Sequence, residues 1–159
     1  MSKSFISYSH ENDDKRLILD CLLKKYKMQP IVVARRAKPA MLLATKVEEA
    51  LEEADFLIPI LTEQSIYNQW VNQEIGYANK LVKDKKIKII PVLEENLILT
   101  DKLKGFIHKQ MDLPFIFKKH SHRGIENKNF KSACDKLIQH LKKSSFTVKY
   151  NANIAATFT

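Results

Sequence analysis

Segments typical of β-strands and of α-helices alternate along the whole sequence, and this alternation restricts the fold more than any other feature. Short apolar runs are separated by longer stretches in which apolar residues recur every three or four positions. The runs lie at residues 4–8, 31–34, 56–61, 87–93 and 114–117. Continuous apolar strands separated by helices are typical of a parallel sheet covered by helices on both faces. The sequence therefore predicts one α/β domain with five parallel strands.

Two prolines challenge this interpretation, because Pro59 and Pro91 fall inside the third and fourth runs. Proline has no N–H group to donate to a neighbouring strand, so it is rare in the middle of a sheet. We expect each proline to lie near a strand end or at a bulge.

The stretches between the runs have helical periodicity. Helices are predicted at residues 15–27, 45–54, 66–83 and 130–143, with a weaker one at 101–109. Thr45 and Glu48 have the spacing of a capping box, in which each side chain bonds the other residue's backbone N–H. Residues 144–159 lose the period, and the sequence leaves open an extra edge strand or an arm that contacts a partner. We therefore assign the domain to residues 1–143 and a C-terminal extension of unknown role to residues 144–159.

The chain is basic, since 27 Lys and Arg against 18 Asp and Glu give a formal net charge of +9. Nucleic-acid binding is one explanation for this excess. However, the lysines are spread over several predicted elements, and few aromatic residues lie among them to stack on bases. A solvated surface that attracts anions explains the charge more simply. Nucleic acid is therefore not an expected partner.

Several classes of protein are excluded by composition. No apolar run approaches the roughly 18 residues that a membrane span needs, and the N-terminus lacks the apolar core of a signal peptide. Cys21 and Cys134 are too few for a disulfide framework or a zinc cluster, so we expect two free, packed thiols. His108, His120 and His122 have no partner at ligand spacing, which predicts no metal site. A cytoplasmic protein without membrane contact is expected.

The predicted helix at residues 66–83 carries the most informative side chain, Glu74. At about 100° per residue, one narrow apolar stripe should pack on the sheet; it consists of Val71, Ile75, Ala78 and Val82. A second stripe about a quarter turn away consists of Trp70, Glu74, Tyr77 and Leu81. Glu74 thus lies at the border between the packed face and the crevice where open α/β sheets bind ligands. The alternatives are a solvent-exposed glutamate and, for Trp70, an anchor in the core.

Polar residues also gather where the first strand ends, at Ser7, Tyr8, Ser9 and His10. Their side chains should open onto the same edge of the sheet, where hydroxyl groups can bind ribose or phosphate oxygens. Ordinary capping and turn hydrogen bonds would explain the same residues. The three glycines of the chain form no phosphate-binding loop.

Four blocks of sequence follow one another along the chain. They are FISYSHENDD (5–14), KVEEALEEADFLIPILTEQS (46–65), QWVNQEIGYA (69–78) with its WxxxE motif, and IKIIPVL (87–93). Together they resemble the TIR (Toll/interleukin-1 receptor) domain, and specifically bacterial stand-alone TIR proteins of the NAD+-cleaving, Thoeris-like anti-phage type. The resemblance implies a flavodoxin-like fold of three layers, whose five parallel strands run in the order 2-1-3-4-5.

The resemblance also implies a site. Enzymatic TIR domains cleave the nicotinamide–ribose bond of NAD+ with the glutamate of the WxxxE motif, which falls on Glu74 here. The implied substrate-binding residues around this glutamate are Phe5, Ser7 and Tyr8 on the first strand and Trp70 and Tyr77 on the helix.

The loop after the second strand corresponds to the family's BB loop, which commonly gates the site and mediates self-assembly. Arg35 and Arg36 begin this loop, and their guanidinium groups are candidates for pairing with the diphosphate of the substrate. Solvated loop charges are the alternative. Many family members have Pro-Gly in the loop where this chain has Pro39-Ala40, so the loop conformation is expected to be atypical.

The primary hypothesis is a cytoplasmic enzyme that consumes NAD+ as substrate, without a cofactor, and releases ADP-ribose or a cyclic ADP-ribose isomer. In anti-phage defence a separate effector protein would sense a cyclic product. The alternative is a non-catalytic module that acts through TIR–TIR contacts, as a signalling scaffold or a host-directed virulence factor. Self-association is expected in both cases, and nucleic-acid binding ranks third.

Overall fold

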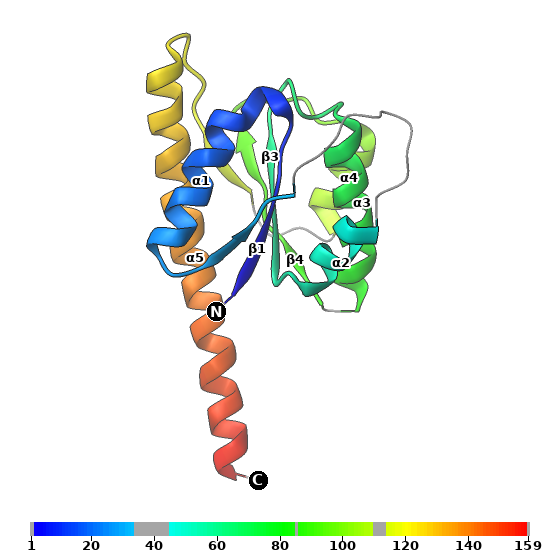
Figure 1. Cartoon of the computed structure of the whole chain (residues 1–159), viewed down its shortest axis with the longest axis vertical. Helices are drawn as coiled ribbons and strands as arrows, with labels where there is room; N and C mark the ends of the chain where they lie inside the picture. The colour runs from blue at the N-terminus through cyan, green and yellow to red at the C-terminus, as the bar shows by residue number, and fades with distance from the viewer. Residues whose placement is uncertain (1, 34–44, 85, 110–113, 159) are drawn as a thin grey trace.

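The strands form one sheet between two layers of helices (Figure 1). The computed structural model describes residues 2–33, 45–84, 86–109 and 114–158. The sheet order is β2 (Gln29–Ile31), β1 (Lys3–Ser7), β3 (Phe56–Leu61), β5 (Val92–Glu94) and β6 (Phe115–Phe117), with β4 (Lys88–Ile89) paired to β3. All of these strand pairs are parallel. The predicted α/β class and strand order are confirmed, with β4 and β5 together taking the place of the predicted fourth strand.

That fourth strand is interrupted at Pro91, as its position in the run predicted. β4 pairs with the first half of β3 through Leu57↔Ile89, and β5 pairs with the second half through Ile60↔Val92. Pro91 lies between them and cannot donate to β3. Its carbonyl oxygen still accepts a hydrogen bond from the N–H of Phe115 at 3.0 Å.

Pro59 does not behave as expected, because it lies inside β3 and pairs with Ser7 of β1. The backbone around it explains why the strand persists. The carbonyl oxygen of Leu57 faces β4 and accepts from the N–H of Ile90 at 2.9 Å. Pro59 is two residues further along and faces the same neighbour, where the ladder is already broken at Pro91. The two prolines therefore interrupt the sheet at one shared place.

The second strand was predicted at residues 31–34, but β2 covers Gln29–Ile31 and contains Pro30. β2 is the edge of the sheet and pairs only with β1 among the described strands, through Ser4↔Pro30 at its middle. Proline is tolerated on an edge strand because its missing N–H can face away from the ladder.

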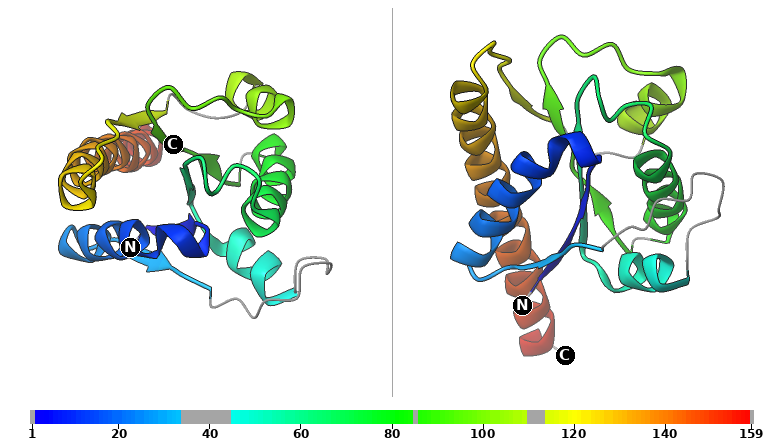
Figure 2. Two further views of the ribbon diagram at one scale, coloured as in Figure 1. Left: turned by 90° about the horizontal axis from the view of Figure 1, so that it is seen from above. Right: turned by 45° about the horizontal axis from the view of Figure 1, so that its top comes forward.

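Helices cover both faces of the sheet, as Figure 2 shows from above. The short η1 (His10–Asn12) leads into α1 (Asp13–Lys25), which packs on one face beside α5 (Arg123–Phe158). The other face is covered by α2 (Thr45–Glu53), α3 (Gln69–Lys83) and α4 (Asp101–Lys109). The core accordingly forms two clusters, one on each side of the sheet.

The last helix is much longer than the predicted one at residues 130–143. It begins at Arg123, because the carbonyl oxygen of His122 accepts from the N–H groups of Ile125 and Glu126, both at 3.1 Å. It continues to Phe158, so residues 144–158 extend the helix and do not add an edge strand. In Figure 1 this C-terminal part runs past the end of the sheet.

The two cysteines are free but differ in environment, since Cys134 is buried and Cys21 is exposed. The expectation of two packed thiols therefore holds for Cys134 alone. Burial raises the pKa of the Cys134 thiol well above its usual range. Among the described residues, no helix combines the length and apolar character needed to cross a membrane.

Candidate active site

Glu74 and Ser7 meet at the carboxyl end of the central strands. Ser7 is the last residue of β1, and Glu74 lies on α3, the helix that follows β3. The Ser7 hydroxyl donates a hydrogen bond to Glu74 Oε1 at 2.7 Å, and both residues are 0% exposed. This carboxyl group therefore has one oxygen fixed by a side chain from the neighbouring element. The position agrees with the general location of ligand sites in open α/β sheets.

The start of α3 sets the direction in which Glu74 points. Asn68 caps the helix, and its Oδ1 accepts from the N–H of Val71 at 3.1 Å. The buried face of the helix is made of Val71, Glu74, Ile75, Ala78 and Leu81. Glu74 is thus inside the packed face, further in than the border position that periodicity predicted. A solvent-exposed glutamate, the alternative from sequence, is wrong.

The predicted residues of the first strand divide between the two faces of the sheet. Phe5 is 0% exposed and packs in the cluster that contains Val71 and Ile75 of α3, on the side where Ser7 contacts Glu74. Tyr8 packs against the other cluster, and the guanidinium carbon of Arg16 lies 5.8 Å from its ring centroid. Alternation along the strand explains the division, because odd and even residues face opposite ways. Phe5 and Ser7 accompany Glu74, whereas Tyr8 lies across the sheet.

The two aromatic residues of α3 have different surroundings. Trp70 is half-buried in the first turn of the helix. Tyr77 is also partly buried, and its hydroxyl donates to Glu52 of α2. That hydrogen bond raises the pKa of Tyr77 to about 12. The Tyr77 hydroxyl therefore links α3 to α2 through a hydrogen bond. Binding of substrate by the Tyr77 ring remains a prediction.

The predicted loop arginines, Arg35 and Arg36, lie outside the described residues, as does Pro39-Ala40. Their proposed contact with a diphosphate therefore stays a prediction from sequence.

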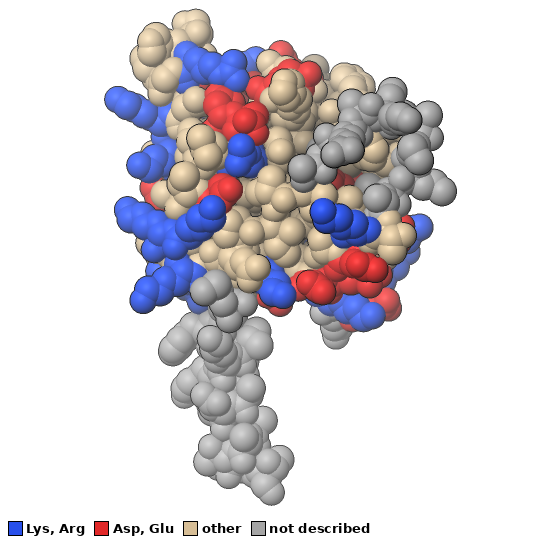
Figure 3. Space-filling model, in the orientation of Figure 1, with Lys and Arg blue, Asp and Glu red and all other residues tan. Residues whose placement is uncertain are grey.

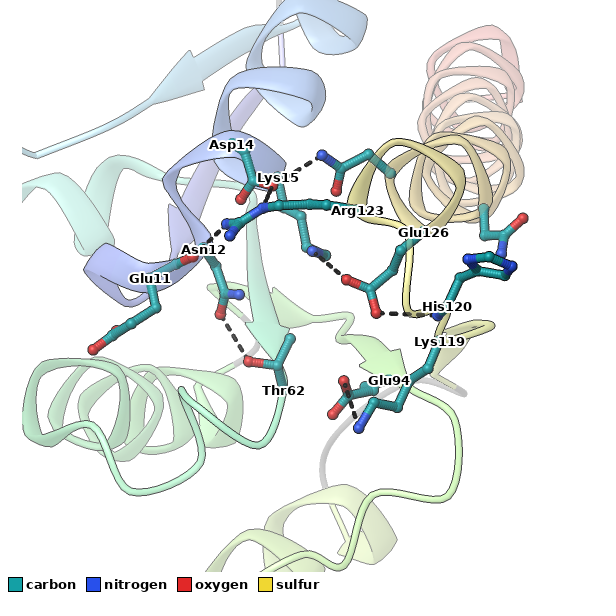
Figure 4. A network of polar contacts seen from close by, with 12 residues as sticks. Glu11, Asn12, Asp14, Lys15, Thr62, Glu94, Lys119, His120, Arg123 and Glu126 are labelled. Carbon is teal, nitrogen blue, oxygen red and sulfur yellow. Dashed lines mark hydrogen bonds and ion pairs between the residues drawn. The ribbon is translucent and has the colours of Figure 1, made fainter.

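A buried polar network joins the loops that follow β1 and β3. Thr62 Oγ1 donates to Asn12 Oδ1 at 2.8 Å (Figure 4), and Ser9 Oγ donates to the same oxygen at 3.1 Å. Ser65 Oγ accepts from the Thr62 N–H at 2.7 Å and donates to the Ile60 carbonyl oxygen at 2.8 Å. The turn chemistry expected at Ser9 is present. Thr62 and Ser65 were missed, although small polar residues directly after a buried strand are the signal that would have found them.

No group of three or more metal-ligating side chains is present in the part of the chain that the structure describes. Charged side chains of both signs appear on the face shown in Figure 3, with Lys and Arg most numerous along its left side. The interpretation of the net charge of +9 as a solvated surface stays a prediction from sequence.

The family follows from a direct match of sequence: a model of the TIR domain family matches residues 5–125. The chain belongs to the TIR domain family. No curated protein matches the sequence significantly.

Solved structures agree with this TIR domain in fold. The CMP N-glycosidase BcmB of Clostridium botulinum is 20% identical, with a TM-score of 0.61 over 86% of this chain and 99% of that one. TIR domains of the activated Roq1 resistosome, which recognises the effector XopQ, are 11% identical, with a TM-score of 0.54 over 91% of this chain and 99% of theirs. The diflavin flavoprotein A3 of Nostoc sp. is 13% identical, with a TM-score of 0.61 over 92% and 97% of the two chains. The flavodoxin-like architecture is thereby established.

Proposed function

We propose that this TIR domain is an N-glycosidase that cleaves the nicotinamide–ribose bond of NAD+, with Glu74 as its catalytic residue. The observation that carries the proposal is a fully buried glutamate fixed by the Ser7 hydroxyl at the sheet edge where ligands bind. Removing a carboxyl group from water costs free energy, so a fold gains nothing from this residue as a scaffold. The likeness to a CMP N-glycosidase supports the same class of reaction.

The chemistry suits a single carboxylate. Nicotinamide leaves with both electrons of the C1′–N bond and departs as a neutral molecule, so no acid is needed to protonate it. The ribose left behind acquires oxocarbenium character, as in glycoside hydrolysis. A fixed carboxylate stabilises this positive charge. Water then adds to C1′ and loses a proton, giving ADP-ribose; attack by a nucleophile of the same molecule gives a cyclic isomer.

Access of substrate is part of the proposal, because Glu74 is 0% exposed in the single chain. NAD+ reaches the carboxylate only after the side chains over it move, and such steps often control turnover. Self-association through TIR–TIR contacts is expected, and we propose it as the trigger of this movement. The Roq1 resistosome contains TIR domains in an assembled state, which supports the expected self-association.

The first test is incubation of the purified protein with NAD+ over a series of protein concentrations, with nicotinamide measured by chromatography and mass detection. Glu74→Gln keeps the size of the side chain and removes its charge, and we expect it to lower the rate at least 100-fold. Glu49→Gln makes the same change on the exposed side of α2 and should leave the rate unchanged.

Two results would contradict the assignment: no nicotinamide at any protein concentration, or a Glu74→Gln variant as active as the parent. CMP is included as a second substrate, and release of cytosine with NAD+ intact would move the specificity to nucleoside monophosphates. If neither NAD+ nor CMP is cleaved, the non-catalytic interaction module is favoured.

Anti-phage defence, with a separate effector that senses a cyclic product, is the proposed biological setting if a cyclic isomer is found.

A further inference from the structure

A cavity of about 430 Å³ opens at the carboxyl edge of the sheet, and neither Ser7 nor Glu74 is part of its lining. It is formed by the loops after β1, β3 and β6, by β5, and by the first turns of α1 and α5 (Figure 4). Its volume lies within the range of roughly 300–1,000 Å³ that is usual for small-molecule sites. The network around Asn12 and Thr62 forms part of its wall.

The wall of this cavity contains buried polar side chains. Asn12 and Lys15 are each 3% exposed, Thr62 is 1% exposed and Glu94 is 5% exposed. A buried lysine needs compensation, and Lys15 Nζ lies 3.0 Å from Glu126 Oε2. A wall with only a structural role would be built from apolar residues, because burying polar side chains costs desolvation free energy. The polar lining therefore indicates a ligand.

Two carboxylates of the cavity wall, those of Glu126 and Glu94, already have partners inside the protein. Glu126 Oε2 accepts from Lys15, and its Oε1 accepts from the backbone N–H of His120 at 3.4 Å. Glu94 Oε2 accepts from the N–H of Glu63 at 3.0 Å, and Glu94 Oε1 lies 3.6 Å from Lys119 Nζ. Figure 4 shows a third carboxylate, that of Glu11, directed away from this group. These contacts use part of the acceptor capacity of Glu94 and Glu126.

Some hydrogen-bond donors of the wall have no acceptor among the described residues. Asn12 Oδ1 takes two hydrogen bonds, whereas its amide nitrogen donates to no acceptor among the described residues. Lys15 Nζ makes one hydrogen bond, to Glu126, although an ammonium group has three N–H donors. Arg123 uses Nε toward Asp14 and Nη2 toward the Glu11 carbonyl oxygen. The first turns of α1 and α5 also border the cavity, and helix N-termini favour anions.

We propose that this cavity binds a phosphate monoester of a sugar or nucleoside, as a second site that does not depend on Glu74. The phosphate oxygens accept from the Asn12 amide and from the N–H groups of Lys15 that Glu126 does not use. Lys119 Nζ lies 3.4 Å from Glu63 Oε1 and 3.6 Å from Glu94 Oε1, so it is already paired. A lone phosphate ion would fill only a small part of 430 Å³, and the remaining space accommodates the sugar. The sugar hydroxyls can donate to the remaining lone pairs of the wall.

The test uses the full chain with three probes: ribose 5-phosphate, inorganic phosphate and ribose. Binding is measured by calorimetry and by ¹⁵N NMR of the Asn12 side-chain amide. We expect saturable binding of ribose 5-phosphate, weaker binding of phosphate, none of ribose, and a shift of the Asn12 amide signal. Asn12→Asp keeps the oxygen that Thr62 and Ser9 bond but replaces the donor by a negative oxygen. It should weaken binding at least 10-fold.

Asn68→Asp is the matched control, because Asn12 and Asn68 are the N-cap residues of α1 and α3, and Asn68 lies outside the cavity lining. It makes the same change of charge and should leave binding unchanged. Absence of saturable binding, or an Asn12 amide signal that does not move, overturns the proposal even if Asn12→Asp fails to fold. Equal affinity for phosphate and ribose 5-phosphate overturns the sugar assignment. Glu74→Gln should bind ribose 5-phosphate as the parent does, which separates this site from the proposed glycosidase activity.

Discussion

Two serines of the same strand, Ser4 and Ser7, are both fully buried but differ in what their hydroxyl groups contact. Ser7 Oγ donates to Glu74, whereas Ser4 Oγ has no hydrogen-bond partner among the residues that the structure describes. Ser7→Ala leaves a buried carboxyl oxygen without its donor, and we expect a loss of about 1–3 kcal/mol in the free energy of unfolding. Ser4→Ala removes a hydroxyl that is buried without a partner, so no loss is expected. Urea denaturation of the two variants measures both effects.

Nicotinamide release by the same variants then separates a structural role of Ser7 from a positioning role. If Ser7 fixes the Glu74 carboxyl group for catalysis, Ser7→Ala lowers kcat below the value of Ser4→Ala under conditions where both are fully folded. Equal kcat in the two folded variants would contradict that role.

The sequence predicted a site residue well where local periodicity sets the direction of its side chain. It predicted poorly the contacts between residues that are distant in sequence. Helical periodicity predicted Glu74 close to the packed face of its helix. Strand alternation is enough to place Phe5 and Ser7 on the same face of the sheet. The Ser7–Glu74 contact joins residues 67 positions apart, and no local pattern encodes such a pair. The Tyr77–Glu52 hydrogen bond is missed for the same reason. Tyr8 was grouped with Ser7 by sequence position, although adjacent residues of a strand face opposite ways.

At the level of elements, α1 and α5 are joined by an ion pair whose strength depends on pH. Arg123 Nε lies 2.7 Å from Asp14 Oδ2 and, by this hydrogen bond, lowers the pKa of Asp14 well below its usual range. The folded protein therefore binds fewer protons than the unfolded chain, whose aspartates titrate near about 3.9. The stabilisation is complete above that pKa and is lost as the pH falls below it. We expect Tm to fall more steeply between about pH 5 and pH 3 in the parent than in Asp14→Asn.

Thermal unfolding at several pH values is the measurement. Asp101→Asn, at the exposed start of α4, serves as the control for removal of one carboxylate. The same acid-induced fall of Tm in the parent and in Asp14→Asn would show that this pair does not govern the acid response.

The elements themselves were predictable because their patterns are local, and the errors have identifiable causes. Among the described strands, apolar runs located all but β2, which shares only Ile31 with the predicted run at residues 31–34. The boundaries of β2 depended on the tolerance of an edge position for Pro30. The position of Pro59 inside β3 could not be foreseen, because it depends on the break at Pro91 in the neighbouring strand. The length of α5 was missed because its last part has no apolar period, and periodicity detects a packed face rather than a helical backbone.

On the scale of the whole molecule, the structure brings together groups that the sequence keeps far apart. The cavity beside the central strands takes residues from the loops after β1, β3 and β6 and from α1 and α5. Because parallel strands all end at one edge, loops distant in sequence converge there. The sequence predicted the edge as the place of a site but not the cavity, whose polar wall exists only after the helices have packed.

The domain boundary at residue 143 is the last prediction, and it concerns how much of the chain the fold needs. The α5 side chains in the core cluster are Phe130, Ala133, Cys134, Leu137, Ile138 and Leu141. Among the α5 residues whose side chains the structure describes, which end at residue 143, Leu141 is the last one in the cluster. Figure 1 shows α5 continuing past the sheet beyond it. A chain of residues 1–143 should therefore keep the cooperative unfolding of the full chain, with Tm changed by no more than a few degrees. Calorimetry of the two chains measures this, and light scattering of the same samples measures self-association. Loss of cooperative unfolding would make the extension part of the domain, whereas unchanged Tm with weaker self-association would identify it as an arm that contacts a second copy.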